Sequence, residues 1–265
     1  MKFRFQRKYL AIPYILFFLF FIIVPVFLIV FYAFTDKVTG TFSFSNLVKF
    51  FSDDTNINVL IISLTYGLIN TILCLLIGYP VAYFLADRKI NKSAVLVTLF
   101  IMPMWINFVI RTGATRDLLT WIGLSGGSYP EAATIIGLVY NYLPFTILPL
   151  YTTMLKMDRN QIEASRDLGA TPVQTFIKVI IPMTMPGIVS AATMVFMPTI
   201  SSYVISDILS EYNVVLFGSY IDLYFNQNDW YFGSFMALIM LLLIAISVVI
   251  SRKFSKDNEG KESIW

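Results

Sequence analysis

Carboxylates are the chemically active side chains that this sequence offers in number, because it contains no histidine and a single cysteine, Cys74. Histidine is the commonest general base and transition-metal ligand, and one cysteine cannot close an internal disulfide. Four carboxylates fall within residues 207–229, a stretch without Lys or Arg: Asp207, Glu211, Asp222 and Asp229. Carboxylates and aromatic rings together bind organic cations. We therefore expect neither a catalytic residue nor a metal site in this chain, and these carboxylates are either cation ligands or ordinary acidic surface residues.

The elements that must position these residues are expected to be membrane-spanning helices. The sequence is 57% hydrophobic and 13% charged, and crossing a bilayer takes about 20 helical residues. The first apolar stretch follows four basic residues, as in a signal peptide, but it is too long and no small-residue cleavage site follows Ala33, so a retained helix is expected. Six windows without a charged residue can each hold one helix: Tyr9–Thr35, Thr55–Ala86, Ser93–Ile110, Ala132–Leu155, Val179–Ser206 and Trp230–Ser251. We predict an all-α polytopic membrane protein with six transmembrane helices in a single domain, residues 1–265.

Lys and Arg are distributed unequally between the two sides that six spans create. Fifteen lie before the first span, in the second-to-third and fourth-to-fifth connections and in the C-terminal tail, whereas four lie in the other connections. Because cytoplasmic loops carry the excess of Lys and Arg, both termini are expected in the cytoplasm. The opposite side carries nine carboxylates: Asp36, Asp53, Asp54, Asp117, Glu131, Asp207, Glu211, Asp222 and Asp229. They form either an acidic mouth for a cation or a basic partner, or an acidic surface that simply tolerates translocation.

A polar segment, about residues 156–182, interrupts the apolar sequence on the predicted cytoplasmic side. Asp158 is a suitable helix cap, and Gln161 follows three residues later as in a capping box. Gly169 suits a left-handed turn that ends this helix, and Thr171-Pro172 is typical of the start of another. An apolar face at helical spacing follows: Val173, Phe176, Ile177 and Ile180. We predict two short helices with a sharp bend, which form either a protrusion that fits a groove on another protein or an ordinary, well-capped surface loop.

The same segment resembles the EAA motif of ABC-importer permeases, which reads E-A-A, three residues, G, nine residues and I-x-L-P. Here Glu163-Ala164-Ser165 is followed after three residues by Gly169, and V-I-I-P begins nine residues later. Ser165 replaces the second alanine of the motif, Val179 replaces its isoleucine, and Ile181 replaces its leucine. The resemblance implies a MetI-like type I ABC importer permease fold, in which the first short helix is the coupling helix that seats in a cleft of an ATPase subunit. It assigns the ATPase contact to Glu163, Ala164, Ser165, Arg166, Asp167, Leu168 and Gly169.

The sequence contains no nucleotide-binding P-loop. That motif reads G-x-x-x-x-G-K-[S/T], whereas the only Gly-Lys pair, Gly260-Lys261, is followed by Glu262 and has no glycine five residues earlier. The predicted spans lack charged residues, which disfavours a proton relay as the source of energy. ATP and Mg²⁺ are therefore expected on a separate ATPase subunit, and no cofactor is expected in this chain.

Four further blocks are similar to spermidine/putrescine permeases of the PotB type. They are "LIGYPVAYFLA" (76–86), "MPMWINFVIRT" (102–112), "GLVYNYLPFTILPLYTTM" (137–154) and "NDWYFGS" (228–234). The similarity extends over about residues 10–255 and implies a polyamine substrate and a multi-pass subunit of the bacterial cytoplasmic membrane. It also implies, besides membrane lipid, a second permease chain (PotC-like), two ATPase subunits (PotA-like) and an extracytoplasmic substrate-binding protein (PotD-like), with no nucleic acid partner.

A polyamine needs carboxylates for its ammonium groups and aromatic faces for its methylenes. Asp207 and Glu211 are the leading carboxylates, and Trp105, Asn107 and Tyr203 are candidates to line the pathway. The alternative for the aromatic residues is an interfacial position, because Trp and Tyr concentrate at bilayer surfaces in membrane proteins generally.

Other functions remain open at this point. Arg111, at the outer end of the third predicted span, is expected to pair with an acidic neighbour that the sequence does not name. The same class of transporter could carry another small solute, such as an amino acid, thiamine or iron. A membrane-embedded hydrolase is a remote alternative, because the sequence lacks H-E-x-x-H, G-x-S-x-G and aspartates within its spans. A pure scaffold is equally remote, since the coupling motif argues against it.

Overall fold

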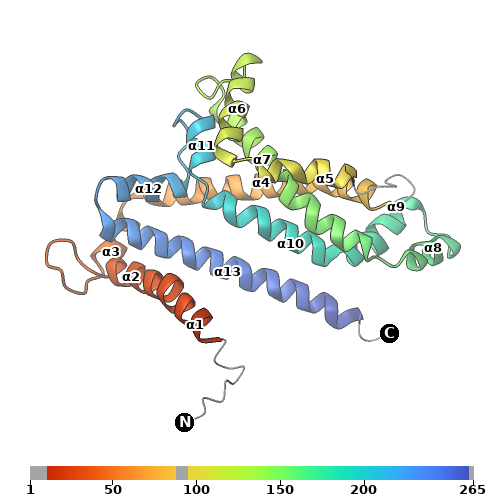
Figure 1. Ribbon diagram of the computed structural model, residues 1–265, viewed down its shortest axis with the longest axis horizontal. Coiled ribbons are helices and arrows are strands. Elements are labelled where there is room, and N and C mark those ends of the chain that lie inside the picture. The colour runs from red at the N-terminus through yellow and green to blue at the C-terminus, as the bar shows by residue number, and fades with distance from the viewer. Residues whose placement is uncertain (1–10, 88–94, 263–265) are drawn as a thin grey trace, which may run out of the picture. The chain divides into compact units, whose positions relative to one another are not determined.

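The protein is built from helices joined by turns, as a computed structural model shows for residues 11–87 and 95–262, with side chains described up to residue 253 (Figure 1). The elements in chain order are α1 (Ile12–Phe18), the π-helix η2 (Leu19–Ile23), α2 (Val24–Ala33), α3 (Ser45–Ser52), α4 (Asp54–Ala86), α5 (Val95–Ile101), the 3-10 helix η3 (Met102–Trp105), α6 (Phe108–Trp121), α7 (Pro130–Leu155), α8 (Arg159–Asp167), α9 (Pro172–Thr175), the π-helix η4 (Phe176–Ile180), α10 (Ile181–Ile200), α11 (Val204–Leu209), α12 (Phe217–Asn226) and α13 (Trp230–Glu262). The all-α class is confirmed.

The chain divides into two compact units. Unit 1 comprises Met1–Ile57 and Tyr220–Leu243, and unit 2 comprises Asn58–Ser219 and Ile244–Trp265. Some basic residues on which the predicted topology rests lie outside the described residues: Lys2, Arg4, Arg7, Lys8, Arg88, Lys89 and Lys92, together with the side chains of Lys256 and Lys261.

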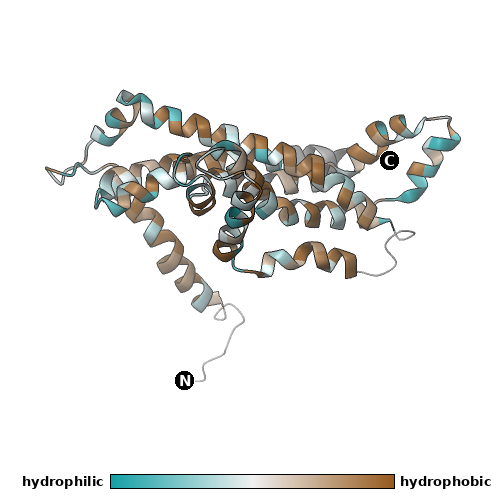
Figure 2. Cartoon of the chain, turned by 90° about the horizontal axis from the view of Figure 1, so that it is seen from above, coloured by the Kyte–Doolittle hydropathy of each residue, from teal (hydrophilic) through white to brown (hydrophobic). Residues whose placement is uncertain are grey.

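Among the described residues, five helices are long and apolar enough to cross a membrane: Ile12–Ala33, Asp54–Ala86, Pro130–Leu155, Pro172–Ile200 and Trp230–Lys253. A sixth candidate is a pair of helices, Val95–Trp105 and Phe108–Trp121, bent by 97°. Figure 2 shows the long helices largely in the brown of apolar residues. The third window, Ser93–Ile110, predicts one helix, and the structure breaks it after Trp105. Counting charges cannot reveal this break, because the residues that make it are uncharged.

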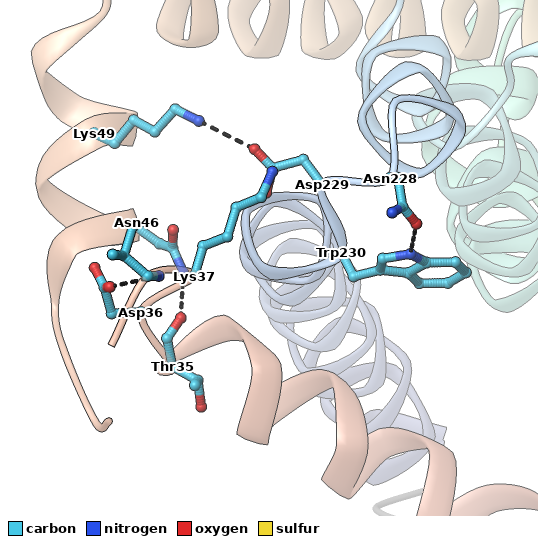
Figure 3. Close-up of polar contacts among 9 residues, drawn as sticks. Thr35, Asp36, Lys37, Asn46, Lys49, Asn228, Asp229 and Trp230 are labelled. Atoms are coloured by element: carbon cyan, nitrogen blue, oxygen red, sulfur yellow. Dashed lines mark hydrogen bonds and ion pairs between the residues drawn. The ribbon is translucent and has the colours of Figure 1, made fainter. Parts of the chain in front are cut away.

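In unit 1, polar side chains hold the connection between the first span and α3. The buried Asn46 of α3 donates its Nδ2 to the carbonyl oxygen of Thr35 at 3.3 Å. The carboxylate of Asp229 lies between two ammonium groups, 3.6 Å from Lys37 and 3.5 Å from Lys49 (Figure 3). One amide and one shared carboxylate therefore tie this connection to α3 and to the residue before α13.

The centre of unit 2 is the packing of α7 against α10, which lie side by side (Figure 1). Leu150 of α7 and Ala191 of α10 are fully buried in this core. Gly187 of α10 permits a close approach, since a Cβ there would lie 2.8 Å from Cβ of Thr153 and 3.2 Å from the carbonyl oxygen of Pro149. These two helices therefore form a tightly packed pair that connects the two ends of unit 2.

Hydrogen bonds between side chains join α4 to α10 inside the apolar core of unit 2. Asn70 Nδ2 donates to Thr199 Oγ1 at 2.7 Å, and the hydroxyls of Tyr79 and Thr184 are 2.8 Å apart. Between apolar helices such polar pairs act as specific links, because lipid offers them no competing partner. They set the register of α4 along α10.

The close approach at Gly187 predicts a steric effect of Gly187→Ala. Overpacking of a tight core costs about 1–3 kcal/mol, so the purified protein should unfold at a lower temperature in detergent. Gly113→Ala on α6 is the matched control, because a Cβ at Gly113 would have no atom within 4 Å; that change should be neutral or stabilising by up to about 1 kcal/mol. Equal melting temperatures for the two variants would contradict the packing described here.

Candidate functional site

The polar protrusion of unit 2 consists of α8 and a bend at Gly169. Asp158 caps α8 by accepting a hydrogen bond from the backbone N–H of Asn160 at 3.0 Å, which confirms the predicted cap. Gly169 has φ +81°, and its N–H and that of Ala170 donate to the carbonyl oxygens of Arg166 and Ser165. This is the Schellman arrangement, which satisfies carbonyls that a helix end leaves unpaired. The predicted left-handed turn at Gly169 is therefore confirmed.

The second predicted helix begins as expected but does not end as a separate element. Thr171 caps α9 and forms a reciprocal capping box with Gln174. The box therefore lies at the start of α9, after the bend, and not at Asp158 and Gln161 where the sequence suggested one. The backbone then continues through η4 into α10, so that Pro172–Ile200 is one candidate span. Pro182 has no N–H to donate, and a π-helical turn precedes it, in which the N–H of Ile181 bonds the carbonyl of Phe176. The prediction of two short helices is therefore wrong in one respect: α8 is a short helix, whereas the second predicted helix is the first part of the fifth span, which begins at Pro172.

One face of α8 is attached to the protein and the other is open. Ile162 is buried, and Ser165 Oγ donates to the carbonyl of Ile162 and lies 3.0 Å from the hydroxyl of the buried Thr175. Serine here replaces the second alanine of the EAA pattern, and it uses its hydroxyl to connect α8 across the bend. Glu163 and the 88% exposed Leu168 point outward with Ala164, Arg166 and Asp167. An exposed, capped helix with a fixed bend is a surface that another protein can engage.

Away from α8, a cavity of about 570 Å³ lies beside the middle of α7 and the C-terminal end of α10. It is lined by the broken third span, α7, the end of α10 and α11. Asn107 makes the break possible, because its Oδ1 accepts hydrogen bonds from the N–H groups of Val109 and Ile110 at the start of α6. The break opens the wall of the bundle where the cavity forms.

Arg111 is held in the cavity wall by neutral acceptors. Its Nε and Nη2 donate to Asn141 Oδ1 at 3.0 and 2.7 Å, and its Nη1 donates to the carbonyl oxygen of Pro103 at 2.5 Å. Asn141 in turn donates Nδ2 to the carbonyl of Gly137 and to Thr112 Oγ1. The acidic partner predicted for Arg111 is therefore replaced by an amide of α7 and a carbonyl next to the break.

Three of the five predicted pathway residues line this cavity: Trp105, Asn107 and Tyr203. Trp105 is 79% exposed and Tyr203 is 44% exposed. Asp207 and Glu211 are not among the residues of its wall. Asp207, on α11, accepts a hydrogen bond from Ser219 Oγ at 2.7 Å, and Glu211 follows α11 in a left-handed conformation, φ 52°.

Arg111 and Asn141 are the wall residues whose roles the sequence did not disclose. Asn141 is buried in the middle of an apolar window, and a polar amide there is costly unless it is hydrogen-bonded. A buried amide inside an apolar span is therefore the signal that could have identified Asn141, together with Arg111 just after the preceding window.

The conformation at Gly169 predicts the effect of two substitutions. A Cβ at this position meets no atom within 4 Å, so the cost of Gly169→Ala comes from its positive φ alone and is about 1 kcal/mol. Hydrogen exchange at the amides of residues 169 and 170 should then become about fivefold faster. Gly169→Asn should change the rate less, because asparagine tolerates the left-handed region. Equal rates in the two variants would argue against a conformational requirement for glycine.

The sequence has relatives among characterised transport proteins. Residues 3–257 match the family described as "Binding-protein-dependent transport system inner membrane component". The chain is 36% identical over 220 residues to the spermidine/putrescine transport system permease protein PotB of Salmonella typhimurium (strain SL1344), covering 77% of each chain. It is 36% identical over 213 residues to the protein of the same name from Escherichia coli (strain K12), covering 75% of this chain and 78% of that protein.

Solved structures share the fold. A bacterial ABC transporter involved in the import of alginate superposes with a TM-score of 0.62 at 19% identity, over 95% of this chain and 94% of that chain. The inward-facing MetNI methionine ABC transporter gives a TM-score of 0.59 at 21% identity, over 76% of this chain and 95% of that chain. The apolar helices, the cavity at a broken span and these relationships lead to one assignment: the chain belongs to the binding-protein-dependent transport system inner membrane component family, and it is a multi-pass ABC transporter permease.

Proposed function

We propose that this permease takes up polyamines, spermidine or putrescine, as a non-catalytic subunit of an ATP-driven importer. It forms half of the translocation pathway and receives work from an ATPase subunit through α8. The observation that carries the proposal is the exposed helix α8, capped by Asp158 and turned at Gly169, which carries the EAA residues at the end of unit 2 remote from the cavity. The names of the relatives supply the substrate class.

The Lys and Arg residues of unit 2 support an orientation with α8 in the cytoplasm, and we propose both termini on the same side. Lys156, Arg159, Arg166 and Lys178 lie in or beside α8 and the start of the fifth span, against Arg111 and Arg116 in α6 near the cavity. Basic residues favour the cytoplasmic side of a membrane. The family match runs through both compact units, which supports one permease domain over residues 1–265 in the bacterial cytoplasmic membrane.

The proposed assembly needs partner subunits that bind ATP and that supply the other half of the pathway. Without a P-loop, the chain depends on two ATPase subunits that bind ATP and Mg²⁺, and the coupling residues Glu163–Gly169 form the contact. A second permease chain supplies the other half of the pathway, and an extracytoplasmic binding protein delivers the substrate. ATP binding then shifts the pair between outward-open and inward-open states.

The cavity offers aromatic and polar surface to an extended cation. Trp105, Tyr203 and Tyr142 present rings over which methylenes and ammonium groups can lie. Asp207 lies one helical turn beyond Tyr203, the residue that caps α11, and its carboxylate accepts a hydrogen bond from Ser219 Oγ at 2.7 Å. We propose that the ammonium contact of this chain is at Asp207 and Glu211, on and just after α11, outside the cavity wall.

One observation favours a different solute within the same class of transporter. The cavity wall carries the guanidinium of Arg111, and none of the described residues that line it is acidic. A zwitterion such as an amino acid would use a positive charge that a polyamine would avoid. Uptake competition separates the two: excess putrescine should abolish spermidine uptake on the polyamine proposal, and excess amino acids should not.

For the coupling role, Glu163→Lys should abolish transport and release the ATPase subunit while leaving membrane insertion intact. The residue is exposed, so folding does not depend on it, and the change inverts a charge in the proposed contact. Co-purification of the ATPase with the tagged permease is the measurement. Asn160→Lys, an exposed position on the same helix, controls for added positive charge. Retained association and uptake in Glu163→Lys would remove α8 from the docking role.

For the pathway, Asp207→Asn should weaken spermidine uptake more than complex assembly. Asparagine keeps an oxygen that can accept the Ser219 hydroxyl but loses the charge, and a charge-assisted hydrogen bond exceeds a neutral one by about 1 kcal/mol, roughly fivefold in KM. Asp117→Asn, whose side chain is 71% exposed, is the control. Unchanged kinetics in Asp207→Asn would place Asp207 outside the pathway.

A further inference from the structure

Helix α8 is attached to its neighbours in two different ways. Towards α9 it is attached by the Gly169 bend and by the hydroxyl pair of Ser165 and Thr175. Towards α4 it is attached by Arg159, at its own first position, which makes two polar contacts with the end of that helix. The first attachment is partly buried and short, whereas the second is a long side chain that is 52% exposed.

The two contacts of Arg159 use the shape of its guanidinium group. Nη1 lies 3.3 Å from Oδ1 of Asp87, the residue after α4, and Nη2 donates to the carbonyl oxygen of Ala86, the last residue of α4, at 3.2 Å. Carbonyls at a helix C-terminus lack intrahelical donors and carry negative partial charge. A planar fork can serve a carboxylate and such a carbonyl together, which the single ammonium of lysine does less well.

This contact borders the face of α8 that carries the coupling motif. A hollow of about 160 Å³ lies between α8 and the end of α4, and its lining includes Asp87, Arg159, Glu163 and Arg166. A partner that engages Glu163 and Arg166 therefore acts next to the Arg159–Asp87 contact.

Helix α4 leads from this contact to the far end of unit 2. There, Oγ of Ser63, a residue of α4, accepts a hydrogen bond from the backbone N–H of Phe217 at 2.6 Å. Two residues further on, Ser219 donates to Asp207. One continuous helix thus connects the coupling helix with the segment that holds the carboxylate proposed for the pathway.

We propose that Arg159 is a positioning residue that transmits displacement of the coupling helix α8 to α4, through its paired contacts with Asp87 and the Ala86 carbonyl. The inference rests on the proposed coupling role of α8. A half-exposed ion pair contributes little to folding stability, so its loss separates transmission from folding. Arg159 acts through α4 and touches neither substrate nor nucleotide.

The test uses the complete transporter, reconstituted with its permease partner, ATPase subunits and binding protein in proteoliposomes. Spermidine uptake and ATP hydrolysis are measured on the same preparation, and their ratio gives the coupling. Arg159→Ala should lower the ratio by about fivefold or more, within the range of energetic coupling between sites, while the ATPase subunits still co-purify. Arg159→Lys should give an intermediate ratio, because the charge remains and the fork is lost.

Two further variants distinguish a positional role from a general effect of charge. Arg159→Asp should lower the ratio at least as much as Arg159→Ala, and adding Asp87→Arg should restore part of it, because the pair reforms in reverse. Arg116→Ala is the matched control: Arg116 forms an exposed ion pair with Asp117 at 2.9 Å inside one helix, so its loss should leave the ratio unchanged.

The outcomes separate this inference from the proposed function. Wild-type ratios in Arg159→Ala and Arg159→Lys, with ATPase subunits bound, would overturn the role of Arg159 and leave the coupling role of α8 standing. Failure of the ATPase subunits to associate with the unmodified permease would overturn both. A loss in Arg159→Asp that Asp87→Arg does not relieve would also count against the paired contact.

Discussion

The structure depends on one constraint: a backbone that leaves a helix inside a membrane must find partners for its N–H and C=O groups within the protein. Two of the places where the described chain of unit 2 leaves helical geometry are the break in the third span and the protrusion at α8, and at both places side chains or turns supply partners for the backbone groups. At the cavity end, Asn107 accepts the first N–H groups of α6 and Arg111 donates to the carbonyl of Pro103. At the protrusion, Asp158, Thr171 and the turn at Gly169 do the same for α8 and α9.

These two interruptions are also the places with the features of function. A helix that is broken and recapped opens a gap in the wall of a bundle, and here the gap becomes the cavity beside Arg111 and Asn141. A helix that ends and turns back exposes a short polar element, and here that element carries the coupling motif. Between them, α7 and α10 pack closely at Gly187. The two interruptions therefore coincide with the cavity and with the exposed helix to which we assign the pathway and the ATPase contact.

The attachment of α8 shows how a small departure from a family pattern acquires a structural role. Serine in place of alanine at 165 puts a hydroxyl within 3.0 Å of Thr175. On the other side, Arg159 reaches the end of α4 with a flexible side chain. Helix α8 therefore combines a partly buried connection to the start of the fifth span with a half-exposed one to the end of α4.

The sequence by itself determined the helical class, five of the spans, the cap at Asp158 and the turn at Gly169, because these depend on local composition, helix length and backbone preference. It also suggested Trp105, Asn107 and Tyr203 as residues lining a pathway, and these three residues line the cavity. It could not determine the 97° break in the third span, the continuity of α9 with α10, or the partners of Arg111. The hydrogen bonds of Arg111 with Asn141 join residues 30 positions apart, and only the packing of α6 against α7 brings these two side chains together. The break and the continuity of α9 with α10 depend on local backbone geometry that charge and composition do not specify.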